Sequence, residues 1–73
     1  MDLTAAADLA EQHPGRWVKA DGDYNTHTGN SIRTGDYARF RNGRWEVRGQ
    51  FCRTTDTGQR RYTIWVKFLG ANQ

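Results

Sequence analysis

Hydrophobic and polar residues alternate along the C-terminal half of the chain. Two alternating runs, 37–41 and 44–48, flank Asn42-Gly43, a dipeptide that favours a two-residue hairpin turn because both positions tolerate positive φ. A second turn is predicted at residues 55–58, between two further alternating runs. The pattern therefore predicts a three-stranded antiparallel meander over residues 37–69.

The parity of the two hairpins predicts the register of this meander. We expect Val47 opposite Val66, and Thr54 opposite Gln59 near the second turn, since a slip of one residue would mix the two faces. Apolar residues then share one inner face. That face carries Ala38, Phe40, Trp45, Val47, Gly49, Phe51, Tyr62, Ile64, Val66 and Phe68.

The outer face of the predicted sheet collects most of the arginines. In the expected register Trp65 lies opposite Arg48, within reach of a cation–π contact, and Glu46 lies between Arg39 and Lys67. Trp17, on an earlier strand, is expected to cover the core or the sheet edge. The basic and aromatic residues of interest are Arg39, Arg41, Arg44, Arg48, Arg61, Trp65 and Lys67, with Arg53 and Arg60 near the tip.

The N-terminal half predicts two helices and a strand. An alanine-rich helix over residues 1–13 can be capped by Asp2 or Thr4, and Pro14-Gly15 ends it. A strand is expected at 16–20, turn residues at 21–25, and a short helix or turn at 26–35 with Ile32 inward. Residues 70–73 should fray. The order of elements predicts an α+β fold whose helices cover one sheet face, and leaves open which strand the first strand joins.

Size and composition narrow the possible functions. Seventy-three residues make one small domain, 1–73, in which a deep catalytic cleft is not expected. The single cysteine, Cys52, cannot form an internal disulfide, and neither a signal peptide nor a membrane-spanning segment is recognisable. We therefore expect a cytoplasmic protein. We also expect no enzyme activity, because no catalytic constellation is visible, and neither a metal nor another cofactor, because the acidic and histidine spacings fit no known site.

Charge is distributed unevenly along the chain. Residues 1–36 hold three basic and six acidic residues, whereas residues 37–73 hold eight basic and two acidic ones. Such asymmetry is typical of a protein that offers one basic surface to a polyanion, although outward strand positions are polar in any case.

Six stretches of the chain share a pattern with a known group of proteins: Leu9, 13–18, 29–35, 37–41, 45–47 and 62–68. In these stretches the chain resembles small uncharacterised proteins of actinobacteriophages. The resemblance implies a phage origin and a setting in the host cytoplasm, and supplies no catalytic or binding residues.

Two functions follow as hypotheses. The first is nucleic-acid binding, with duplex DNA favoured, through phosphate contacts from the arginines, base-edge contacts from Arg44 and Arg48, and stacking by Trp65. The second is docking of the same face on an acidic host protein. In a winged-helix variant, Asn30, Ser31 and Arg33 would contact DNA, with the 41–44 turn as the wing. A homodimer paired through strand edges also remains open.

Overall fold

The computed structural model describes residues 2–70, with the backbone alone for residues 21–23. It contains three strands in one antiparallel sheet of order β1-β3-β2, with helices packed on the sheet. The predicted α+β fold is confirmed, and the first strand lies beside the last one. The elements are α1 (Leu3–Gln12), β1 (Trp17–Tyr24), α2 (Thr28–Arg33), the 3-10 helix η1 (Ala38–Phe40), β2 (Arg44–Thr54) and β3 (Arg60–Gly70).

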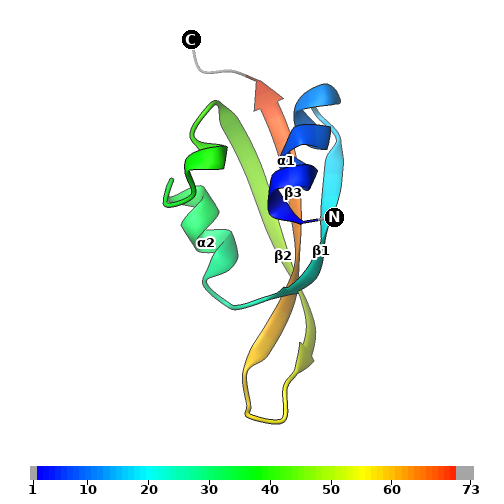
Figure 1. The fold of residues 1–73 in the computed structure, drawn as a ribbon, viewed down its shortest axis with the longest axis vertical. Helices are drawn as coiled ribbons and strands as arrows, with labels where there is room; N and C mark the ends of the chain where they lie inside the picture. Colours follow the sequence, from blue (N-terminus) through cyan, green and yellow to red (C-terminus); the bar gives the residue numbers. More distant parts are fainter. Residues whose placement is uncertain (1, 71–73) are drawn as a thin grey trace.

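Both helices cover the same face of the sheet (Figure 1). The Asp2 side chain caps α1 by accepting a 2.8 Å hydrogen bond from the Ala5 N–H, which is one of the two caps predicted. Alanine at the buried positions lets this helix approach the sheet closely, and it packs on β1 and β3, while α2 packs on β2. The core between the layers consists of Ala6, Ala7, Ala10, Val18, Ala20, Ile32, Phe40, Val47, Ile64 and Val66.

The segment before β2 differs from the prediction. Residues 38–40 form η1 instead of a strand, so the third strand of the sheet is β1 and not 37–41. Arg39 reaches α1 instead, where its guanidinium contacts Asp8 at 2.6 Å and Glu11 at 2.8 Å. Phe40 is buried with its ring 4.8 Å from that of Trp45. The Arg39 contacts join segments distant in sequence, and they outweigh the local alternation.

Gly43 is required for a different reason from the one predicted. Positive φ occurs at Gly15, Gly35, Gly58 and Gly70, but not at Asn42 or Gly43, so this dipeptide forms no type I′ turn. A Cβ atom at Gly43 would lie 2.6 Å from the Gly70 carbonyl oxygen and 2.6 Å from Phe68 Cε1. Glycine is therefore needed here for close approach of the chain to the end of β3.

The β2–β3 hairpin has the predicted register over most of its length. Trp45 pairs with Phe68, Val47 with Val66 and Phe51 with Tyr62, as expected. An irregularity between Phe51 and Arg53 then shifts the pairing, so Thr54 lies opposite Arg60 and not Gln59. Gly58 closes the turn with φ of 85°.

The outer part of this hairpin projects beyond the helices (Figure 1). β1 extends to Tyr24, past the predicted end at residue 20, and part of the expected turn at 21–25 is therefore strand. Its last pairing is Tyr24 with Tyr62. Phe51, predicted to be core, is 55% exposed because the helices do not reach it, and Ala38 is also exposed.

Three further predictions concern a membrane span, the C-terminal residues and the short second helix. No helix among residues 2–70 is long and apolar enough to cross a membrane. The expected fraying of residues 70–73 concerns mostly residues 71–73, which lie outside the described part of the chain. The short helix at 26–35 is confirmed as α2, with Ile32 only 3% exposed.

Candidate functional site

The sheet face opposite the helices carries an arrangement of tryptophan and basic side chains. On this open face Trp17 of β1 is paired with Lys67 of β3, and Lys19 of β1 with Trp65 of β3. Trp65 also lies opposite Arg48 of β2, as predicted. Because cross-strand partners point to the same side of a sheet, all three strands contribute to one surface. We call Trp17, Lys19, Arg48, Gln50, Trp65 and Lys67 the open-face cluster.

Two basic side chains of the open face contact the ring of Trp17. Lys67 Nζ lies 4.7 Å and Arg48 Cζ 5.6 Å from the centroid of its ring, both within the range of cation–π attraction. The sequence predicted an Arg48 contact with Trp65, so the aromatic partner is a different tryptophan. Trp17 reaches Arg48 across the central strand, which explains how one indole contacts cations from two other strands.

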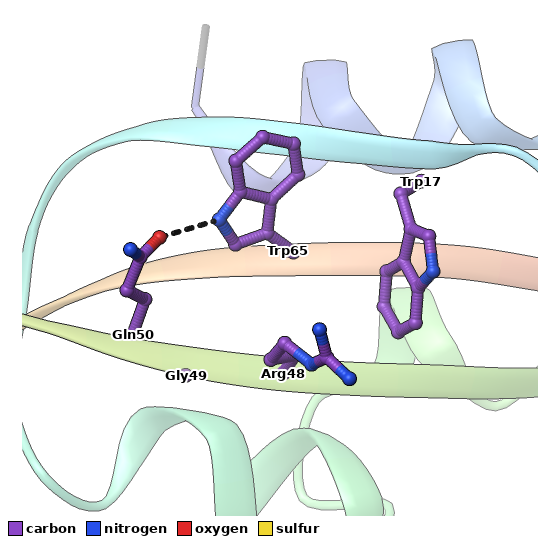
Figure 2. Close-up of a pocket in the computed structure, with 5 residues that line it drawn as sticks. All are labelled: Trp17, Arg48, Gly49, Gln50 and Trp65. Carbon is purple, nitrogen blue, oxygen red and sulfur yellow. Dashed lines mark hydrogen bonds between the residues drawn. The ribbon is translucent and has the colours of Figure 1, made fainter.

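Trp65 is oriented by a hydrogen bond from its indole. Its Nε1 donates to Gln50 Oε1 at 3.4 Å, and the residue is half-buried. Figure 2 shows Trp65 and Trp17 on the same face, separated along the strand direction, with the Arg48 guanidinium turned toward Trp17. Trp17, Arg48, Gly49, Gln50 and Trp65 line a shallow open cavity of about 610 Å³. The indoles thus flank a space that has polar groups along one side.

The charge of the open face is mainly positive. Glu46 was predicted to lie between Arg39 and Lys67. It forms an ion pair with Lys67 at 3.1 Å, whereas Arg39 pairs with Asp8 on the helix side. Lys19 and Arg48 are exposed. An exposed pair such as Glu46–Lys67 contributes little to stability, in the range of about 0–1 kcal/mol.

Toward the hairpin tip, the same face continues with further basic residues. The shifted register puts Arg53 directly opposite Arg61. Arg61 Nη2 donates to Gln59 Oε1 at 3.2 Å. Cys52 is exposed, with its Sγ 2.7 Å from Thr63 Oγ1. The basic surface therefore extends from the open-face cluster along the projecting hairpin.

Two of the predicted site arginines lie elsewhere. Arg39 is held by Asp8 and Glu11 on the helix side, and Arg41 Nε donates to the Gly35 carbonyl. Their expected place on an outer strand is wrong, because that segment is not a strand. Of the other predicted site residues, three meet in the open-face cluster: Arg48, Trp65 and Lys67. Arg53 and Arg61 lie farther along the hairpin, and Arg60 is opposite Thr54 near its tip. Arg44 is the first residue of β2.

The Arg39 ion pairs also shift proton affinities. Hydrogen bonds from Arg39 and Asn42 hold the pKa of Glu11 below its ordinary value of 4.5. The hydrogen bonds of Glu11 and Asp8 raise the pKa of Arg39, which is protonated at any physiological pH. This arginine therefore connects η1 to α1 and is already engaged by carboxylates.

Sequence reasoning missed Trp17 and Lys19 as members of the surface. The available signal was the alternation of Trp17 and Lys19 with the small apolar residues Val18 and Ala20. Val18 and Ala20 are buried, which turns the other two residues toward the open face. The contribution of this short strand could not be assigned while its neighbour in the sheet was unknown.

The structure does not contain the hairpin that the winged-helix hypothesis required at residues 41–44. The 41–44 segment joins η1 to β2 and is not the tip of a hairpin. Arg33, expected to contact DNA from the second helix, donates from Nη2 to the Val47 carbonyl at 2.6 Å. That carbonyl belongs to an edge strand, so Arg33 reduces the capacity of the β2 edge to pair with another chain.

The site defines an α+β domain with an aromatic and basic open sheet face. Among residues 2–70, no group of three or more His, Cys, Asp or Glu side chains is placed to hold a metal ion. No protein-family model, curated protein or solved structure matches the chain.

Proposed function

We propose that the protein binds nucleic acid through the open face of its sheet. The observation that carries this function is the meeting of Lys19, Arg48 and Lys67, one from each strand, around Trp17 and Trp65 on a face that no helix among residues 2–70 covers. Cations attract phosphates and release counterions, while indoles offer flat surfaces to bases. The buried core of the sheet lies on the other side, against α1 and α2.

The hairpin supports the same function through its electrostatics. Arg53 and Arg61 lie opposite each other across the two strands, so two guanidinium groups come from adjacent strands near the hairpin tip and could both contact phosphate. Together with the open-face cluster they form a basic surface along the long axis of a molecule that measures 44 × 20 × 15 Å. The surface suits an extended polyanion better than a compact anionic ligand.

The test is a binding titration with fluorescently labelled oligonucleotides, single-stranded and duplex, at about 50 and about 200 mM salt. We expect measurable affinity at the lower salt concentration and a steep loss at the higher one. The Arg48→Gln and Lys67→Gln variants should each weaken binding and reduce the salt slope by about one unit. No binding of either form of nucleic acid at the lower salt concentration would contradict the function.

Arg41→Gln is the matched control. It removes the same charge from the segment between α2 and β2, where Arg41 is bonded to the Gly35 carbonyl. We expect it to leave the affinity and the salt slope almost unchanged. An equal effect of Arg41→Gln and Arg48→Gln would indicate attraction by net charge alone.

A second candidate function is docking on an acidic protein, and the cavity between the indoles favours it. Tryptophan and arginine side chains around a shallow apolar space are typical anchors of protein interfaces. Affinity capture from host extract before and after nuclease treatment separates the two functions. A partner that resists nuclease and is lost in the Trp65→Ala variant would support docking on protein. Both functions fit a cytoplasmic setting in a phage-infected host, where Cys52 would remain a thiol.

A further inference from the structure

The indoles of the open face have more apolar surface than phosphate binding requires. Trp17 and Trp65 are each half-buried, although the core formed by residues 2–70 lies on the other side of the sheet. Lys67 and Arg48 lie within cation–π range of the Trp17 ring, and the Trp65 indole donates a 3.4 Å hydrogen bond to Gln50. Side chains positioned in this way lose little conformational freedom when a flat ligand group stacks on them.

Duplex and single-stranded nucleic acids differ in what they can offer an indole. In a duplex each base is stacked between its neighbours, so a protein on its surface meets base edges, sugars and phosphates. An unpaired strand can turn its bases outward and stack them on aromatic side chains. The aromatic part of the open-face cluster therefore gains a partner only when the bases are unpaired.

The polar members of the cluster complete a site for an unpaired base. The cavity between the two rings is bordered by the Arg48 guanidinium and the Gln50 amide, which can donate to or accept from the edge of a base. Lys19 of β1 is the cross-strand partner of Trp65, and Lys67 of β3 is the cross-strand partner of Trp17. Each indole thus has an adjacent cation for the phosphate that accompanies a stacked base.

We infer, resting on the proposed function, that the ligand of the open face is a single strand of nucleic acid, with bases stacked on Trp65 and Trp17. The backbone of the strand follows the long axis of the sheet, from Lys67 toward Arg53 and Arg61 on the hairpin. This differs from the duplex preference expected from the arginines alone. Single-stranded DNA and RNA share the chemistry that the surface recognises.

The test compares one strand in two states. A labelled oligothymidylate of about twelve nucleotides is titrated alone and after annealing to oligoadenylate, at the same salt concentration, with oligouridylate as the RNA arm. We expect at least about tenfold tighter binding of the unpaired strand. Trp65→Ala should weaken single-strand binding by about 5- to 100-fold, and Trp65→Phe by less, since it keeps a ring for stacking.

Phe51→Ala is the matched aromatic control. Phe51 is 55% exposed on the other face of β2, where its ring packs edge-on to Tyr62 with centroids 5.9 Å apart. We expect its removal to leave single-strand affinity unchanged, and thermal unfolding of each variant checks that the fold is intact.

The outcomes separate this inference from the proposed function. Equal or tighter binding of the duplex, or an unchanged single-strand affinity in Trp65→Ala, would overturn the single-strand inference and leave nucleic-acid binding in place. Absence of binding to both forms would overturn both. Tight binding of only one of the two unpaired strands, DNA or RNA, supports the inference and identifies the sugar.

Discussion

The two faces of the sheet are built from alternating residues of the same strands, yet they differ in what their side chains contact. On the helix-covered face, Ala20, Val47, Ile64 and Val66 are buried against α1 and α2. On the open face, Trp17 and Trp65 lie among cations, and the described part of the chain places no second layer over them. Because the first set makes the core and the second does not, stability and binding should depend on different faces.

The largest loss of stability is expected from the helix-covered face. Ile64 is 1% exposed, and Ile64→Ala should lower the free energy of unfolding by about 2–4 kcal/mol, since it removes core contacts and leaves a cavity. Chemical denaturation measures the loss. Thr63→Val, one residue away on the open face, should change stability by less than about 0.5 kcal/mol. Equal losses would mean that the two faces are not energetically distinct.

The next largest effect is expected at the end of the sheet. Gly43→Ala should cost about 1–3 kcal/mol, because the added methyl group meets the Gly70 carbonyl and the Phe68 ring. Gly49→Ala is the control within β2. Its Cβ would lie 3.9 Å from both Ile64 Cδ1 and Tyr62 Cδ1, which is ordinary contact. Thermal unfolding should show the first variant destabilised and the second one nearly unchanged.

A smaller effect is expected from the ion pairs that hold η1 to α1. Arg39→Gln should lower stability at neutral pH by about 1 kcal/mol, a value reduced by the partial exposure of these groups. The pKa of Glu11 is depressed in the folded protein, so its contribution is complete above its ordinary value of 4.5 and is lost as the pH falls through the folded-state pKa.

Melting temperatures measured from neutral to acidic pH test whether stability falls as Glu11 becomes protonated. The wild-type protein should lose stability below about pH 4.5, and the Arg39→Gln variant should lose less over the same range. Parallel pH profiles for the two proteins would show that Arg39 does not cause the shift in Glu11.

The smallest effect on stability is expected at the centre of the open face. Trp65→Thr keeps a residue that favours strands and should cost less than about 1 kcal/mol, while it removes the stacking surface for a base. Denaturation and oligonucleotide titration of the same variant measure both quantities. A loss of stability as large as that of Ile64→Ala would assign Trp65 to the structure and remove the main reason for the proposed function.

The elements that local sequence patterns specify were predictable. The alanine-rich helix, the Asp2 cap and the register of β2 with β3 up to Phe51 are confirmed, because each depends on residues close in sequence or on strand parity. With that register, Arg48 and Trp65 were correctly placed opposite each other before β1 had a known neighbour.

The rest depended on contacts between distant segments. Residues 37–41 alternate as a strand would, but Arg39 meets carboxylates 28 and 31 positions away in the sequence. No local signal reports such contacts, and this is why Arg39 and Arg41 were wrongly placed on an outer strand. Trp17 was missed for a related reason: its role depends on β1 joining β3, which neither charge nor periodicity specifies.

The three tryptophans allow the most direct test of the open face as the binding surface. Trp17 and Trp65 lie on that face, whereas Trp45 lies on the helix side, with its ring 4.8 Å from those of Phe40 and Phe68. In a ¹⁵N-labelled sample each indole N–H gives its own NMR signal, so one titration with oligothymidylate reports on both faces. The proposed function predicts large shifts for Trp65 and Trp17 and little change for Trp45. Shifts confined to Trp45, or no shift in any indole at saturating oligonucleotide, would contradict it.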